Sequence, residues 1–345
     1  MGWFRRTLLH SIRLLGGFAV AQHFTRKQLR ILGYHGFSVR DEHVLSPYVF
    51  MRTETFERRM RILRKRKVPV ISLDEAIDRL RHGKIANAEV VITLDDGWAS
   101  NLTVVPILQK YAYPACIYIT TEHLSAGTDA FNVTVAHMVH SSRKPSMSLR
   151  NIHPQIDGDY HIGRDPAAAA GTLVNAAARI ATLSERQQLL APIAESLGLD
   201  YAEFVKGGRF QFLSRAEIRA IAELGIGIQL HTHTHSLPDD TFEAMAHEIQ
   251  QNRSAIRELT NVEPTHFCYP SGNYSPWHPE WLSRLGIASA TTCDSGLNGP
   301  EVPRLLLKRY LDSESVSDIE FEAEIAGVRE LLRKMRSTLA RTLLH

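Results

Sequence analysis

Side chains that can bind a metal or move a proton follow the ends of two apolar, strand-like segments. Asp95 and Asp96 follow EVVITL, and His231, His233 and His235 follow IGIQL. In parallel α/β barrels the functional groups gather at the carboxyl ends of the strands. One aspartate with two histidines makes an open site for a divalent ion, with room for water and substrate. The sequence therefore predicts one such site at this end of a sheet or barrel.

The histidine run could bind one ion in two ways. On an extended strand His231 and His235 would share a face but lie about 13 Å apart, too far for a common ion. A helical turn after His231 would bring the pair to about 6 Å, with His233 pointing elsewhere. The alternative keeps the strand and uses His231 with His233. A third alternative is an exposed polar loop whose histidines have no role. Three histidines within five residues make this alternative weak.

The adjacent carboxylates also need a partner. Two aspartates at a strand end repel each other, so at least one needs a cation. An ion bound by Asp96 would supply it and would keep Asp95 ionised as a base, while Gly97 permits a tight turn. The simpler alternative is a turn in which Asp96 caps the next helix. Because a divalent ion polarises carbonyls and acidifies bound water, the predicted chemistry is metal-assisted hydrolysis of an amide or ester.

The segments around these residues alternate between strand and helix patterns. Apolar, β-rich runs occur at 29–36, 89–97, 114–121, 226–230, 266–272 and 288–294, and VPVISL is a further short one. Helical spacing occurs at 53–67, 72–83, 214–225, 241–260 and 277–285. This alternation predicts an α/β fold with a parallel sheet or barrel. Residues 141–210 break it with a polar stretch followed by Ala-rich helical sequence, and we expect a helical insertion there.

Composition excludes several other classes. The 345 residues carry a formal net charge of only +3, so nucleic acid is not expected as a partner. No phosphate-binding glycine motif of the P-loop or dinucleotide type is present. The three cysteines, an odd number without a C-x-x-C pair, argue against a disulfide framework.

Both ends of the chain are basic. Residues 1–30 contain six arginines and lysines and no acid, and the apolar run at 14–21 is too short to span a bilayer. The segment 1–28 could be a cleaved signal peptide, a basic amphipathic segment on a membrane surface, or a solvated terminus. We expect a cytoplasmic protein, with peripheral contact to the inner membrane as an option, in preference to a secreted or periplasmic one.

The C-terminal segment 313–345 has a helical pattern. Its apolar positions fall near one stripe with basic residues beside it: Ile325, Val328, Leu332, Met335, Leu339 and Leu343. We expect an amphipathic helix that either packs on the barrel or lies on a membrane surface.

The motifs at the strand ends resemble those of polysaccharide deacetylases, carbohydrate esterase family 4. ITLDDG resembles T-F-D-D-G, and HTHTH matches H-[ST]-x-x-H. YPACIYITT and FCYPSG resemble two later segments of that family, and TTCDSG is a loose match to a fourth. The resemblance covers residues 29–312. It implies a deformed (β/α) TIM-like barrel, one divalent metal that is usually zinc, and an N-acetylated glycan as substrate.

The resemblance also implies roles for individual residues. By position, Asp95 is the catalytic base, and Asp96, His231 and His235 are the metal ligands, which favours the i, i+4 histidine geometry. The backbone N–H of Ser271 would help to hold the oxyanion of the tetrahedral intermediate.

Two departures from the family pattern stand out. The late L-x-H histidine is missing from RLLLKRYLD (304–312), whereas ILGYH places His35 at the end of the first strand, similar to circularly permuted members such as deacetylases of poly-N-acetylglucosamine. We expect His35 to be the general acid; the alternative is a buried structural histidine. Cys268 stands where the family has an arginine that orients the base, and Arg304 or Arg309 could reach Asp95 instead. Asp294 could contact the site or cap a turn.

The expected function is removal of acetyl groups from N-acetylated sugars of a bacterial surface polysaccharide or its lipid-linked precursor. One alternative is hydrolysis of another amide or of an O-acetyl ester. The other is a catalytically degenerate barrel that binds glycan. The insertion at 141–210 is expected to shape substrate access, because it lies between two active-site strands.

Overall fold

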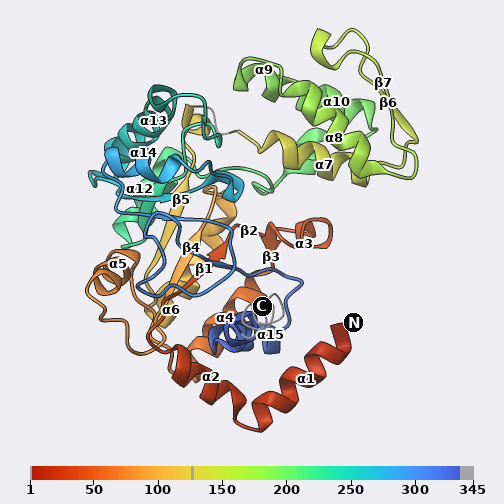
Figure 1. Ribbon diagram of the computed structural model, residues 1–345. Helices are drawn as coiled ribbons and strands as arrows, with labels where there is room; N and C mark the ends of the chain where they lie inside the picture. Colours follow the sequence, from red (N-terminus) through yellow and green to blue (C-terminus); the bar gives the residue numbers. More distant parts are fainter. Residues whose placement is uncertain (1, 126–127, 335–345) are drawn as a thin grey trace, which may run out of the picture.

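The computed structural model describes residues 2–125 and 128–334, and at its centre lies a curled seven-stranded sheet (Figure 1). The strand order is β10-β9-β8-β5-β4-β1-β11, and every pairing recorded between these strands is parallel. The strands are β1 (Arg30–Tyr34), β4 (Val90–Leu94), β5 (Ala115–Ile119), β8 (Gly227–Leu230), β9 (His266–Cys268), β10 (Ser289–Thr291) and β11 (Tyr310–Leu311). This confirms the predicted α/β fold with a deformed, TIM-like barrel.

One late segment touches both edges of the sheet. Leu307 bridges to Thr291 of β10, and its backbone N–H donates to the carbonyl of Ala290 over 2.9 Å. Three residues later, Tyr310 of β11 pairs with Leu32 of β1. The stretch from 304 to 311 therefore closes the curled sheet.

Helices follow the strands, mostly where the spacing predicts them. They are α4 (Thr53–Lys65), α5 (Leu73–Arg81), α6 (Val105–Tyr111), α12 (Arg215–Glu223), α13 (Phe242–Thr260) and α14 (His278–Arg284). Ser72 and Ser214 cap the starts of α5 and α12 by accepting hydrogen bonds from the N–H groups of Glu75 and Glu217. The strand expected at VPVISL is wrong, because only an isolated bridge between Val70 and Val90 forms there.

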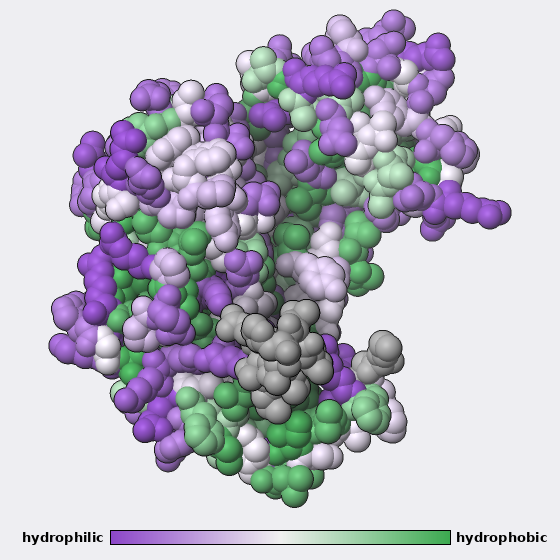
Figure 2. All heavy atoms as spheres, in the orientation of Figure 1, coloured by the Kyte–Doolittle hydropathy of each residue, from purple (hydrophilic) through white to green (hydrophobic). Residues whose placement is uncertain are grey.

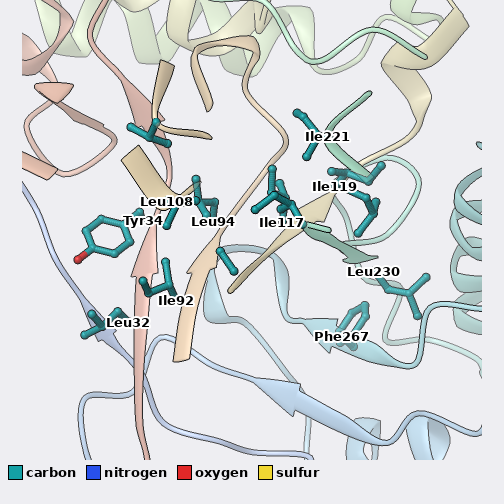
Figure 3. Close-up of a cluster of buried hydrophobic side chains, with 14 of the residues drawn as sticks. Leu32, Tyr34, Ile92, Leu94, Leu108, Ile117, Ile119, Ile221, Leu230 and Phe267 are labelled. Carbon is teal, nitrogen blue, oxygen red and sulfur yellow. The ribbon is translucent and has the colours of Figure 1, made fainter. Parts of the chain in front are cut away.

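Both faces of the sheet are buried, as expected for parallel strands covered by helices. On one face Ile92, Ile117 and Phe267 pack in the largest apolar cluster (Figure 3). On the other face Val91 and Cys116 pack against α5. Since side chains alternate along a strand, Asp95 continues from β4 on the same side as Val91.

A helical body with its own apolar core stands beside the barrel (Figure 1). Its elements are α7 (Phe131–Ser141), the antiparallel pair β6 (Ser146–Ser148) and β7 (Asp159–His161), α8 (Pro166–Ala177), α9 (Leu183–Gln188), α10 (Leu190–Ser196) and α11 (Tyr201–Val205). The short elements β2 (Gly36–Phe37), α3 (Glu42–Leu45) and β3 (Phe50–Met51) lie between this body and the barrel.

The N-terminal residues form two helices, α1 (Gly2–Leu14) and α2 (Gly17–Thr25), joined at Gly16 with φ 78°. They make a V at the end of the barrel opposite the helical body and pack against α15 (Asp318–Ile325) (Figure 1). No helix within the described residues combines the length and the apolar character that crossing a membrane requires.

The C-terminal stretch is not one continuous helix. It breaks at Gly327, whose φ is 78°, and resumes at 328–334. Ile325 and Val328 of the expected stripe are buried, whereas Leu332 is exposed. Met335, Leu339 and Leu343 lie outside the described residues.

Candidate active site

Asp96, His231 and His235 come together at the carboxyl end of the sheet. Asp96 Oδ1 lies 3.1 Å from His231 Nε2 and 3.3 Å from His235 Nε2. The three ligand atoms all lie within 4.8 Å of one another, and a carboxylate with two imidazoles suits a divalent ion of the zinc type. The geometry therefore forms a candidate metal site from the three residues expected to form it.

The histidines reach this arrangement through a loop. His231, at the end of β8, donates its Nδ1–H to the carbonyl of Cys268 over 2.8 Å, which turns Nε2 toward Asp96. Thr232 and His235 have φ values of 63° and 60°, so the helical turn considered for this pair is wrong. His233 points away and contacts Thr121 Oγ1 over 2.9 Å, and the H-x-H pair is not assembled.

Asp96 is ionised and oriented by its neighbours. Burial would raise its pKa, but hydrogen bonds from His231 and His235 hold the pKa well below its usual range. Trp98 Nε1 donates to Asp96 Oδ2 over 2.9 Å, so Oδ1 is left facing the histidines. The φ of Asp96 is 72°, and a Cβ on Gly97 would meet Ile119 at 2.9 Å, which explains the glycine.

Asp95 lies beside this triad and is held by Arg309. Arg309 Nη1 and Nη2 donate to Asp95 Oδ1 and Oδ2 over 2.7 and 2.8 Å, and both side chains are buried. Burial would raise the pKa of Asp95, but the guanidinium charge holds it below its usual range. Of the two arginines considered from the sequence, Arg309 makes this contact, and Arg304 donates to the carbonyl of Ala288.

Small residues make room for this arginine. Arg309 Nη2 lies 3.2 Å from Cys268 Sγ, and a Cβ on Gly33 would come within 3.3 Å of Arg309 Nη1. The carbonyl of Asp294 accepts from the backbone N–H of Arg309 over 2.9 Å. Asp294 thus contributes through its backbone to the segment that carries the arginine.

His35 follows β1 and stands at the edge of the site. Its Nε2 lies 3.8 Å from Asp95 Oδ2, and its side chain is 22% exposed. Asn101 Nδ2 donates to the His35 carbonyl over 2.7 Å and so fixes the backbone there. The His35 ring therefore lies next to Asp95, the expected base, and is partly exposed to solvent.

Two cavities meet at His235. One, of about 280 Å³, also includes Ser271, whose φ of 55° is followed by 72° at Gly272. The other, of about 330 Å³, extends from Asp96 toward the helical body and reaches Arg186 on α9. His235 of the candidate metal site therefore lines both cavities, and Asp96 lines the larger of the two.

The larger cavity contains residues that no sequence motif indicated. Phe212 stacks on His123 with ring centroids 3.8 Å apart and on Trp98 at 5.0 Å. Burial lowers the pKa of His123 to about 4, so this ring is neutral near pH 7. Trp98 directly follows the Asp-Asp-Gly motif and could have been suspected from that position.

Comparison with known proteins agrees with this fold. Residues 183–290 match the family model described as polysaccharide deacetylase. Streptococcus pyogenes deacetylase PplD in complex with acetate is similar in structure, with a TM-score of 0.58 at 15% identity, over 86% of this chain and 98% of that one. No curated protein sequence matches the chain.

Two further solved structures share the fold. IcaB from Ammonifex degensii has a TM-score of 0.53 at 17% identity, over 87% of this chain and 96% of that one. A de-N-acetylase from Aggregatibacter actinomycetemcomitans has a TM-score of 0.54 at 13% identity, over 86% and 99%. The predicted resemblance to polysaccharide deacetylases is confirmed by the family-model match, and the solved structures share the fold. A circularly permuted motif order stays a prediction.

Proposed function

We propose that this protein hydrolyses the acetyl amide of N-acetylated sugars in a bacterial surface polysaccharide or its precursor. The observation that carries this proposal is the pairing of two differently held carboxylates at one strand end. Asp96 faces two histidines, and Asp95 faces an arginine. The first arrangement suits a metal ligand and the second an ionised base.

A divalent ion held by Asp96, His231 and His235 would supply a Lewis acid that polarises the acetyl carbonyl and acidifies water. Zinc fits the carboxylate and imidazole ligands. Arg309 keeps Asp95 charged and fixes both of its oxygens, so Asp95 can accept a proton from the attacking water. Addition of that water to the carbonyl carbon gives a tetrahedral oxyanion.

His35 completes the proposed chemistry. Protonated, it gives its proton to the sugar nitrogen as the carbon–nitrogen bond breaks, leaving acetate and a free amino sugar. Its Nε2 lies 3.8 Å from Asp95 Oδ2, so the proposed acid and base are neighbours at one reacting centre. The backbone N–H of Ser271, in the cavity shared with His235, is proposed to stabilise the oxyanion.

The shape of the site favours a substrate longer than one sugar. Hollows lie on both sides of His235, and the Trp98–Phe212–His123 stack adds aromatic surface to one of them. Aromatic rings suit the apolar faces of sugars. An oligosaccharide could thus extend from the insertion side across the reacting centre.

The test is acetate release from N-acetylglucosamine oligomers of graded length, with Asp95→Asn as the inactive control. Matched O-acetyl substrates separate an esterase from a de-N-acetylase. Activity that disappears with chelator and returns with zinc supports the proposal. Binding of the oligomers without acetate release, in protein that holds metal, would instead establish a glycan-binding barrel.

A further inference from the structure

The outward side of α1 and α2 presents a large apolar surface. We call it the α1–α2 face, and its residues are Trp3, Phe4, Leu8, Leu14, Leu15, Val20 and Phe24. Exposure is 80% for Trp3, 88% for Leu14 and 72% for Phe24. Figure 2 shows apolar side chains gathered along this edge of the molecule, where Figure 1 places the two helices. Such a continuous exposed surface indicates an interaction site.

Both helices bury apolar side chains against α15 and still expose large apolar side chains on their outward side. Arg5 and Arg6 face inward to Glu320 of α15, and Arg13 contacts Glu322 over 3.3 Å. Leu9 and Phe18 are buried in the apolar cluster with α15. Helix periodicity then places the remaining large apolar side chains outward. α1 therefore buries Leu9 toward α15, its half-exposed arginines pair with acids of α15, and large apolar side chains remain on its outward side.

Basic side chains gather where α1 meets α15 and α4, at one edge of this face. Glu320 pairs with Arg5 and Arg6. Glu322 pairs with Arg13 and Arg66, so each carboxylate faces two guanidinium groups. A cavity of about 320 Å³ at this edge is lined by Arg13, Lys65 and Arg66 against the single acid. Burial lowers the pKa of Arg66, Glu322 counteracts this in part, and Arg13 adds a smaller lowering. An anion in the cavity would relieve this excess charge.

We propose that the α1–α2 face binds the surface of an anionic phospholipid bilayer. The aromatic and leucine side chains enter the interface between headgroups and acyl chains, and the basic cavity receives a headgroup phosphate. A second copy fits less well, because a twofold contact through this face would bring the same basic rims together. Residues 1–30 contain no acid that could pair with them.

The contact would hold the whole enzyme in one orientation. Arg30, at the start of β1, donates to the Thr25 carbonyl at the end of α2 and to the Ile325 carbonyl of α15, over 2.8 and 3.0 Å. His35 and the candidate active site lie beyond the other end of β1. The α1–α2 face and the catalytic end are therefore at opposite ends of the strands, and the site would open away from the bilayer.

Flotation of the full chain with phosphatidylglycerol vesicles tests this proposal, with phosphatidylcholine vesicles for comparison. The triple variant Trp3→Ser, Phe4→Ser, Leu8→Ser changes exposed side chains, so the fold should persist, as checked by thermal unfolding. Its binding should fall by about tenfold or more, because it removes three inserting groups. The matched control is Val44→Ser, Tyr48→Ser, Val262→Ser, which removes three apolar side chains that are 59–75% exposed elsewhere.

Two further measurements sharpen the result. Lys65→Glu, at the basic cavity, should weaken binding to anionic vesicles without changing thermal stability. Brominated lipid should quench Trp3, giving a signal that is absent in Trp3→Phe. Failure of the full chain to float at low salt, or equal binding by the triple variant, would overturn the proposal. A concentration-dependent dimer that the triple variant abolishes, with no vesicle binding, would assign the face to a second copy instead.

Discussion

Arg309 and Asp95 form a buried ion pair with two parallel hydrogen bonds, although 214 positions separate them in the chain. The guanidinium lies against Cys268, with Nη2 3.2 Å from Sγ. The resemblance predicts an arginine at position 268 itself. The charge that the base needs is therefore supplied by residue 309, directly before β11.

Replacing this arginine should disable the base. In Arg309→Lys the charge remains but the two-point contact is lost, and we expect kcat to fall about 100-fold, the scale of a disabled acid–base group. The pKa of Asp95 should rise, so the acid limb of the pH–rate profile should move to higher pH. Arg304→Lys is the matched control, and an equal loss in both variants would contradict the assignment.

A relocated arginine gives a second test of this pair. The double variant Cys268→Arg, Arg309→Ala puts the guanidinium at the position that the family pattern uses. We expect it to regain at least about tenfold in kcat over Arg309→Ala alone, because a charge-assisted pair to Asp95 is restored. The double variant should unfold as cooperatively as Arg309→Ala. If it does but its kcat does not rise, the orientation of Asp95 requires an arginine at position 309.

The metal site predicts different outcomes for two neighbouring histidines. Purified protein should hold about one divalent ion per chain after zinc loading, and His235→Ala should lose it, since two ligands bind zinc far more weakly than three. His233→Ala should keep the ion, because its ring contacts Thr121 instead. Elemental analysis decides, and metal loss in His233→Ala alone would favour the H-x-H geometry.

His35 should matter most where the leaving group needs a proton. In His35→Gln we expect kcat on an N-acetyl sugar to fall about 100-fold or more. Hydrolysis of p-nitrophenyl acetate should fall much less, because its phenolate leaves without protonation. Equal losses on both substrates would assign His35 a structural role.

Arg186 should affect binding of the substrate more than chemistry. It lies on α9, lines the larger cavity and faces Glu122 over 3.7 Å. In Arg186→Ala we expect KM for oligomers to rise about fivefold, the scale of one hydrogen bond, with kcat unchanged. Arg179→Ala, an exposed arginine in the same helical body that does not line the cavity, is the control. A fall in kcat at unchanged KM would contradict a binding role.

Acid should loosen the helical body. Burial lowers the pKa of His137 to about 4, and its side chain packs against Phe50 and Phe210. Since the folded pKa lies below the ordinary value of 6.5, stability is complete above that value and falls as the pH drops toward 4. The loss should be about 2 kcal/mol between about pH 6.5 and about pH 5. Hydrogen exchange of residues 131–213 measures it, and His137→Gln should remove most of the pH dependence.

Residues that lie next to one another in the sequence were the easiest to predict. Asp95 and Asp96 directly follow a strand, and the spacing of His231 and His235 limits how they can meet, so the core of the site followed from periodicity and motif. The choice between Arg304 and Arg309 did not, because it depends on how the barrel closes. The side of α1 that packs inward was equally hidden, since Glu320 and Glu322 lie some three hundred residues away.

The segment that closes the barrel is also the one that carries Arg309. Every proposed metal ligand, and Asp95 itself, precedes residue 304 in the chain. A growing polypeptide could thus collect all of its ligands and still have an open sheet and an unneutralised base. Synthesis of one late strand would complete the architecture and activate the enzyme in the same step.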